Sequence, residues 1–154
     1  MDRMLHPLRR LREFLRAGKP PKAESPAHLQ TGVWGEDQAA RWLAEHGFKI
    51  LGRRIRVGDR DEFDLVVRDG EALVFVEVKT RRSELFGTPG SAVDKAKRHS
   101  LSRAAVRYLR TLKHPMVNFR FDVVEVIGAR TGPAPIVRHI PNAFPLDHCY
   151  QLPT

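Results

Sequence analysis

The stretch DEFDLVVRDGEALVFVEVKTR, residues 61–81, contains two strand-like runs on either side of a turn signal. Residues 61–68 and 72–80 are rich in β-branched and apolar side chains, and the Asp69-Gly70 dipeptide between them strongly indicates a tight hairpin. The run LVFVEV is apolar at nearly every position, which fits a central strand covered on both faces. The segment therefore predicts a hairpin in a sheet that is flanked by helices.

The neighbouring segments supply the helices and further strands that such a sheet needs. Apolar side chains at helical or alternating spacing, Gly47 as a helix stop and Ser91 as a helix cap mark these elements. They are a helix over 32–46, a strand over 48–57, a helix from Ser91 to about Lys113, and strands over 119–127 and 136–140. The pattern predicts an α/β domain.

Both ends of the chain are expected to lie outside this domain. Residues 4–17 place leucines and Phe14 at helical spacing among arginines, which predicts a basic amphipathic helix. The Pro-rich stretch 18–27 is typical of a flexible tether. We therefore divide the chain into an N-terminal extension, 1–30, a domain over 31–144 and a C-terminal tail, 145–154.

Composition favours a cytoplasmic protein with a polyanionic partner. The chain has 154 residues, a formal charge of +9, a pI of about 10.4 and one cysteine, Cys149. No apolar run reaches the ~18 residues of a membrane span, and no secretory signal is evident. Basic charge alone does not name the polyanion, because ribosomal proteins, binders of anionic membranes and nucleases share it.

The hairpin is expected to gather charged side chains on one face. With the Asp-Gly dipeptide in the turn, Asp64 lies opposite Phe75 and Glu62 lies opposite Glu77. Glu62, Asp64, Glu77 and Lys79 then project to the same side. Asp64 and Glu77 are diagonal cross-strand neighbours, with β-carbons about 7 Å apart. Both carboxylates can reach one metal ion.

Carboxylates buried on a central strand are unfavourable without a cation. Lys79 offsets part of this repulsion, and Mg²⁺, which prefers few protein oxygens and completes its shell with water and phosphate, would offset more. The alternative is a Glu77-Lys79 pair that only neutralises itself. Glu36, near the start of the first helix, either reaches the same site or only meets the helix dipole.

Basic and histidine residues elsewhere in the sequence are further candidates for binding roles. The long helix carries Lys95, Lys97 and Arg98 among other cations, which could follow a phosphate backbone or form an ordinary solvated face. His139, His148 and Cys149 lack the paired spacing of a zinc site, so we predict no metal there.

Several short motifs occur in the order found in a known family. They are G-x-x-G-E at 32–36, EFDL at 62–65, VFVEVKTR at 74–81, the helix start Ala92-Val93…Lys97, RFDVV at 120–124 and IPNAF at 140–144. In this order they resemble the YraN-like family of bacterial proteins. That family resembles the PD-(D/E)-x-K restriction-endonuclease-like nucleases, particularly archaeal Holliday junction resolvases.

The resemblance implies a mixed sheet flanked by helices and assigns roles by position. Asp64 matches the motif aspartate, Glu77 and Lys79 the E-x-K pair, and Glu36 the additional helix glutamate of resolvase-like members. Phe63 stands where the motif name has proline. Asp64, Glu77 and the Val78 carbonyl are the expected metal ligands, with Glu36 assisting a metal or a water.

The resulting hypothesis is a Mg²⁺- or Mn²⁺-dependent, structure-selective endonuclease of DNA recombination or repair. Its expected partner is branched or single-stranded DNA, contacted by Lys95, Lys97, Arg98 and Arg81, and junction cutting would suit a homodimer. A non-catalytic nucleic-acid-binding or adaptor protein that keeps the fold is the alternative. A ribosome-associated basic protein ranks last, because it gives no reason for carboxylates collected on one sheet face.

Overall fold

The computed structural model describes residues 27–83, 93–112 and 117–151. The elements in chain order are α2 (Ala27–Glu45), β1 (Lys49–Val57), β2 (Asp61–Asp69), β3 (Ala72–Arg81), α3 (Lys95–Thr111), β4 (Phe119–Ile127), β5 (Ile136–Phe144) and the 3-10 helix η2 (His148–Tyr150). The predicted N-terminal helix and the cap Ser91 lie outside the described residues. None of the described helices is long and apolar enough to cross a bilayer.

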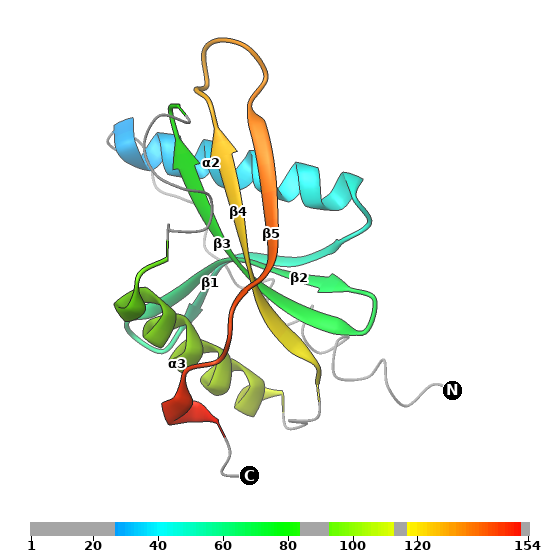
Figure 1. Cartoon of the computed structure of the whole chain (residues 1–154), viewed down its shortest axis with the longest axis vertical. Coiled ribbons are helices and arrows are strands. Elements are labelled where there is room, and N and C mark those ends of the chain that lie inside the picture. The colour runs from blue at the N-terminus through cyan, green and yellow to red at the C-terminus, as the bar shows by residue number, and fades with distance from the viewer. Residues whose placement is uncertain (1–26, 84–92, 113–116, 152–154) are drawn as a thin grey trace.

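The five strands form one mixed sheet in the order β1-β2-β3-β4-β5 (Figure 1). β3 and β4 are parallel, and the other neighbouring strands are antiparallel. A parallel pair needs a crossover connection, and α3 lies in the one between β3 and β4. This architecture agrees with the mixed sheet flanked by helices that the family resemblance implies.

Among the described elements, one helix covers each face of the sheet, so the central strands are buried on both sides. The α3-side core contains a stacked pair of rings, Phe63 and Phe75, with centroids 4.4 Å apart, and Tyr108 of α3 meets Phe75 edge to face. The α2-side core packs Ala39 and Leu43 of α2 on valines of β3 and β4. Burial on both faces explains why β3 is apolar at nearly every position.

The hairpin register differs from the predicted one by two residues. Asp69 pairs with Ala72, so the turn residues are Gly70 and Glu71 rather than Asp69 and Gly70. Gly70 has a φ of 56°, which a glycine adopts without steric penalty. Because the shift is an even number of residues, Val66 and Phe75 share one face of the hairpin in the predicted register and in the observed one.

Three element boundaries also differ from the predictions. α2 begins at Ala27 instead of residue 32, and it therefore crosses the proposed boundary at residue 31. The cap of α3 is Asp94, whose side chain accepts a hydrogen bond from the Lys97 N–H at 2.8 Å. β5 continues through Pro141 to Phe144, which an edge strand tolerates since one side of its backbone needs no partner.

The buried carboxylate of Asp122 holds β4 to β5 where their register shifts. It accepts hydrogen bonds from Arg120 Nε at 2.9 Å, the Asn142 N–H at 2.9 Å and His139 Nε2 at 2.7 Å. Burial alone would raise the pKa of Asp122, but the hydrogen bonds of His139, Arg120 and Asn142 lower it below its ordinary value. The motifs at 120–124 and 140–144 thus meet in a structural network.

Candidate functional site

Asp64 lies where the hydrogen-bonded ladder between β2 and β3 ends. The last regular pair joins Leu65 to Val76. Beyond it, the backbone N–H of Val78 donates to Asp64 Oδ2 at 2.7 Å. A side-chain oxygen thus takes the position of a backbone acceptor, and the carboxylate is fixed against β3 rather than projecting freely from the sheet.

The alternation of side chains along β2 is interrupted at Asp64. Phe63 belongs to the α3-side core and Leu65 to the α2-side core, although residues two apart on a regular strand share a face. Opposite Asp64 on β1 lies Arg54, which has a φ of 49° that is uncommon for any residue except glycine. Both strands are therefore distorted at the same level of the sheet.

Glu77 is the most deeply buried acidic group of the site, with 5% of its side chain exposed. Its Oε1 lies 3.0 Å from Lys79 Nζ, and its Oε2 lies 3.3 Å from Lys97 Nζ at the start of α3. The Lys97 contact is an ion pair without hydrogen-bond geometry, so Oε2 has no hydrogen-bond partner among the residues that the structure describes. A buried carboxylate oxygen in that state can still accept a further ligand.

Glu36 reaches this level of the sheet through close packing of α2 on β3. A Cβ on Gly35 would lie 1.9 Å from Thr80 Oγ1, so a glycine is required for this approach. The adjacent carboxylate of Glu36 is buried and accepts two hydrogen bonds from Arg54, at 2.7 Å from Nε and 3.2 Å from Nη2. The negative charge of Glu36 is therefore compensated by Arg54 of β1 rather than by the lysines.

Electrostatics distinguish Asp64 from an ordinary surface acid. Burial and then the charge of Glu77 raise the pKa of Asp64 from 3.8 to about 7, against the opposing hydrogen bond from Val78. Glu36 raises it further and Lys97 lowers it. A neighbouring cation would favour the ionised form of Asp64, because an opposite charge stabilises a carboxylate.

The structure brings together Asp64, Glu77, Val78 and Lys79, as predicted, and adds Lys97. Glu62 is not part of this group: it lies next to Phe63 on the strand, and its half-exposed side chain pairs with Arg56 at 3.8 Å. The predicted face shared by three carboxylates is therefore wrong, because the interruption at Asp64 reverses the alternation that the prediction extended to residue 62.

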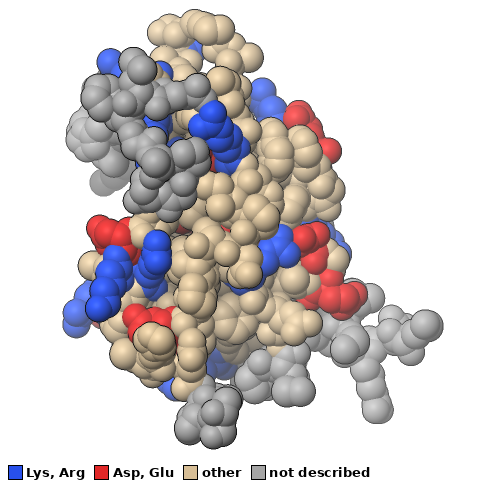
Figure 2. All heavy atoms as spheres, in the orientation of Figure 1, with Lys and Arg blue, Asp and Glu red and all other residues tan. Residues whose placement is uncertain are grey.

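The other predicted nucleic-acid contacts have different environments. Lys95 is exposed, whereas Arg81 lies 3.8 Å from the buried carboxylate of Glu125. Arg98 donates to the Val93 carbonyl at 2.9 Å, and its guanidinium lies over the Phe144 ring. On the face shown in Figure 2, basic side chains are interspersed with acidic ones. Within the described residues, Lys95 is thus the predicted contact with the fewest interactions inside the protein.

Sequence reasoning missed the two cations that organise the site from outside the hairpin. Arg54 holds Glu36, and Lys97, which we expected to contact DNA, meets Glu77 instead. No spacing rule links these residues, because each pair joins elements brought together only by the fold. Lys97 does occur in the helix-start motif of the YraN-like resemblance, and that position was the one available signal.

Comparison with known proteins identifies the family. Residues 35–126 match the model described as "Uncharacterised protein family UPF0102". A UPF0102 protein of Syntrophotalea carbinolica is 46% identical over 121 residues, covering 77% of this chain and 94% of its own length. Another, from Geobacter sulfurreducens, is 44% identical over 129 residues, or 83% of this chain and 99% of its own.

A third relative, from Rhodococcus opacus, is 43% identical over 119 residues, which cover 76% of this chain and 98% of its own length. These alignments extend over nearly the whole of each relative, and the family model covers more than half of the chain. The chain therefore belongs to the UPF0102 family, as the YraN-like order of its motifs predicts.

Proposed function

We propose that this protein is a metal-dependent endonuclease that hydrolyses phosphodiester bonds of DNA in recombination or repair. The observation that carries the proposal is the half-buried Asp64 beside the buried Glu77 at the interrupted end of the β2-β3 ladder, with Lys79 at 3.0 Å from Glu77. Two carboxylates and an ammonium collected at a strand irregularity are poorly explained by stability alone.

The donor set fits Mg²⁺ or Mn²⁺. Asp64 and Glu77 offer hard oxygen atoms, and Glu77 Oε2 is buried without a hydrogen bond from any described residue. The raised pKa of Asp64 means that the surrounding residues compensate its negative charge poorly. A bound cation would therefore stabilise the ionised carboxylate. Glu36 does not join Asp64 and Glu77 in a group of donors within 4.8 Å, so we assign it to a water rather than directly to a metal.

Each residue then has a distinct task. Asp64 and Glu77, with the carbonyl of Val78, hold the metal, which supplies charge stabilisation and a more acidic water when bound. Lys79 has three N–H donors and uses one toward Glu77, which leaves others to orient a water and to meet developing negative charge on the phosphate. Arg54 holds the Glu36 carboxylate in place through two hydrogen bonds.

The partner in this proposal is branched or single-stranded DNA in the cytoplasm. Lys95 and Lys97 begin the helix whose first turn borders Glu77, so a phosphate backbone along α3 would pass the carboxylates. Arg98 and Arg81 also make contacts within the protein, and they would add positive charge to the same surface. Cutting two strands of a junction requires two sites, which a two-fold dimer would provide.

An end-labelled cleavage assay tests the proposal on Holliday-junction, flap, single-stranded and duplex DNA, with Mg²⁺, Mn²⁺ or EDTA. Wild-type protein should give product that depends on metal. Glu77→Gln, which keeps the shape and removes the charge, should reduce the rate by at least ~100-fold while DNA binding persists. Glu62→Gln is the matched control, because Glu62 lies two residues from Asp64 on β2 but outside the group.

A non-catalytic nucleic-acid-binding protein is the second candidate, and one observation favours it. Both oxygens of Glu77 lie near lysine ammonium groups, so the carboxylate could be neutralised without metal. In that case no substrate yields metal-dependent product, and binding survives the loss of both carboxylates. Product formed equally by wild type and Glu77→Gln would contradict the proposed site.

A further inference from the structure

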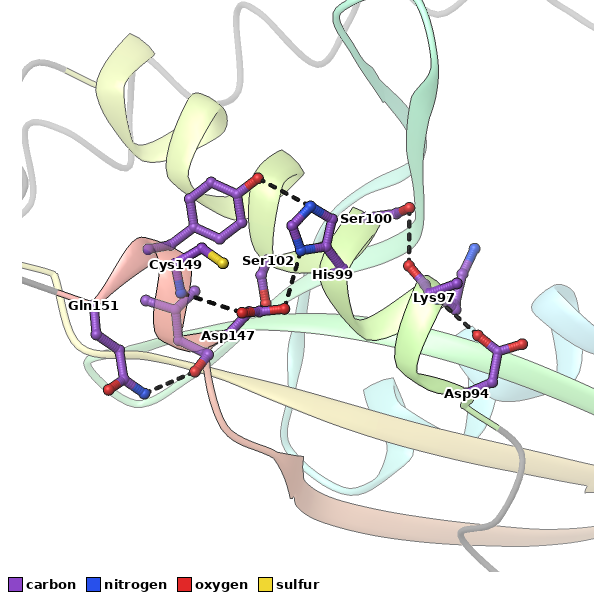
Figure 3. A network of polar contacts seen from close by, with 11 residues as sticks. Asp94, Lys97, His99, Ser100, Ser102, Asp147, Cys149 and Gln151 are labelled. Carbon is purple, nitrogen blue, oxygen red and sulfur yellow. Dashed lines mark hydrogen bonds and ion pairs between the residues drawn. The ribbon is translucent and has the colours of Figure 1, made fainter.

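The C-terminal 3-10 helix η2 is tied to α3 by a polar network that the proposed nuclease site does not use (Figure 3). The backbone N–H of Asp147 donates to the buried hydroxyl of Ser102 on α3 at 3.0 Å. Asp147 also caps η2, accepting from the Cys149 N–H at 3.2 Å. These contacts fix Asp147 and Cys149 beside His99 of α3.

Three potential metal ligands converge in this network. A ring nitrogen of His99, a carboxylate oxygen of Asp147 and the thiol sulfur of Cys149 all lie within 4.8 Å of one another. Within the part of the chain that the structure describes, no other three His, Cys, Asp or Glu residues meet this condition. The histidine is 48 residues away from Asp147 in sequence, so the spacing argument that predicted no metal at Cys149 could not have found this group.

The spacing of these atoms is close to that of a zinc site. Tetrahedral Zn²⁺ bound by sulfur, nitrogen and oxygen at about 2.0–2.3 Å places its ligands roughly 3.3–3.8 Å apart. His99 Nδ1 and Asp147 Oδ2 lie 3.0 Å apart. A small outward movement of both side chains would admit the ion. The thiolate ligand disfavours Mg²⁺ and Ca²⁺, which select oxygen, and favours Zn²⁺.

A second residue of η2 orients the histidine. The hydroxyl of Tyr150 lies 3.4 Å from His99 Nε2, and the two rings are 5.4 Å apart. When Nδ1 binds a metal, Nε2 carries the proton and donates it to such a partner, an arrangement that fixes the tautomer and ring of metal-binding histidines. Asp147 also favours its ionised form, because the hydrogen bond from the Cys149 N–H and then that from His99 lower its pKa below the ordinary value.

We propose that His99, Asp147 and Cys149 form a Zn²⁺ site that fastens η2 onto α3, separate from the Asp64 and Glu77 group. Three protein ligands leave a fourth position for water. That position is open, because Cys149 is exposed and the side chain of His99 is 40% exposed. The site is independent of the nuclease proposal, since it shares no ligand with it.

Cobalt substitution tests the site sharply, because Cys149 is the single cysteine of the chain. Full-length reduced protein is titrated with Co²⁺, and a thiolate-to-cobalt charge-transfer band should saturate at one ion per chain and disappear on adding Zn²⁺. His99→Gln and Cys149→Ser should abolish the band. Tyr150→Phe should weaken Co²⁺ binding by about 10-fold, as loss of an outer partner does.

Two control variants keep the result interpretable. His148→Gln removes a histidine next to Cys149 that is not in the group, and Glu77→Gln removes the other candidate metal ligand; both should retain the band. Circular dichroism checks that each variant is folded. Absence of the band in wild type, its persistence in His99→Gln, or a stoichiometry of one ion per two chains would overturn the proposal.

Discussion

Asp64 is an acid whose charged form the folded protein disfavours. Its pKa is raised from 3.8 to about 7, first by burial and then by Glu77, so the native state keeps a proton that the unfolded chain has lost between about pH 4 and pH 7. The native state binds more protons in this window, so the free energy of unfolding falls as the pH rises through it. Above about pH 7 the whole penalty is present.

Asp64→Asn should therefore stabilise the protein in neutral and alkaline solution. The amide oxygen can still accept the Val78 N–H bond, and the repulsion from Glu77 is removed. We expect a gain of about 1–3 kcal/mol near pH 8 and almost none near pH 4, measured by urea unfolding at both values. Mg²⁺ should stabilise wild type but not this variant if the carboxylate is a ligand.

Glu62→Asn tests whether this gain is specific to the site. Glu62 is half-exposed and only loosely paired with Arg56, so its replacement should change stability by less than about 0.5 kcal/mol at either pH. A similar gain from both variants would show that the effect comes from the general charge balance of β2 and not from burial beside Glu77.

The central residues of the site were predictable because they lie close together in sequence. Asp64, Glu77 and Lys79 belong to one hairpin, and a register error of two residues leaves the side-chain parity of β3 intact. The interruption at Asp64 was not predictable from the hairpin alone, because it coincides with a distorted backbone at Arg54 on the neighbouring strand. That interruption is what removes Glu62 from the group.

Packing of α2 on β3 depends on the absence of a side chain at Gly35. A Cβ there would lie 1.9 Å from Thr80 Oγ1 and 3.1 Å from Thr80 Cβ, so Gly35→Ala must push the helix away from the strand. We expect a loss of about 1–3 kcal/mol in the free energy of unfolding. Because Glu36 is the next residue of α2, the proposed metal-dependent cleavage should also fall.

The cause can be isolated by a second substitution. Thr80→Ala removes the hydroxyl and methyl that the new Cβ would meet, so the Gly35→Ala/Thr80→Ala pair should recover at least half of the lost stability. Urea unfolding of the two single variants and the double variant gives the coupling energy. Additive losses would show that helix propensity or chain entropy, rather than this contact, determines the effect.

Elements with a strong pattern were predicted well, and their ends were predicted poorly. The strand over 119–127 matches β4 residue for residue, because its apolar run begins and ends sharply. α2 begins five residues earlier than expected, since Ala27 to Thr31 carry no apolar stripe that marks a helix. β5 was cut short at residue 140 because Pro141 normally ends a strand, and here the edge position permits it.

For the molecule as a whole, the fold and the choice of binding partner depend on different features of the sequence. The mixed sheet and the two described helices follow from strand-like apolar runs and from apolar side chains at helical spacing, whereas the formal charge of +9 bears only on which partner the surface attracts. The face in Figure 2 mixes both signs, so net charge does not translate into one binding surface there. The position of individual lysines relative to Glu77 decides whether α3 can guide a phosphate backbone.

Salt dependence of DNA binding separates a local contact from the overall charge. Affinity for a labelled junction is measured in EDTA over a range of salt concentrations, and each phosphate contact contributes about −0.9 to the slope of log affinity against log salt. Lys95→Ala removes an exposed cation at the start of α3 and should reduce the slope by about 1. Lys49→Ala, which removes the same charge from an exposed position at the start of β1, should leave the slope unchanged. Equal effects of the two variants would mean that DNA responds only to net charge and that α3 does not form the binding surface.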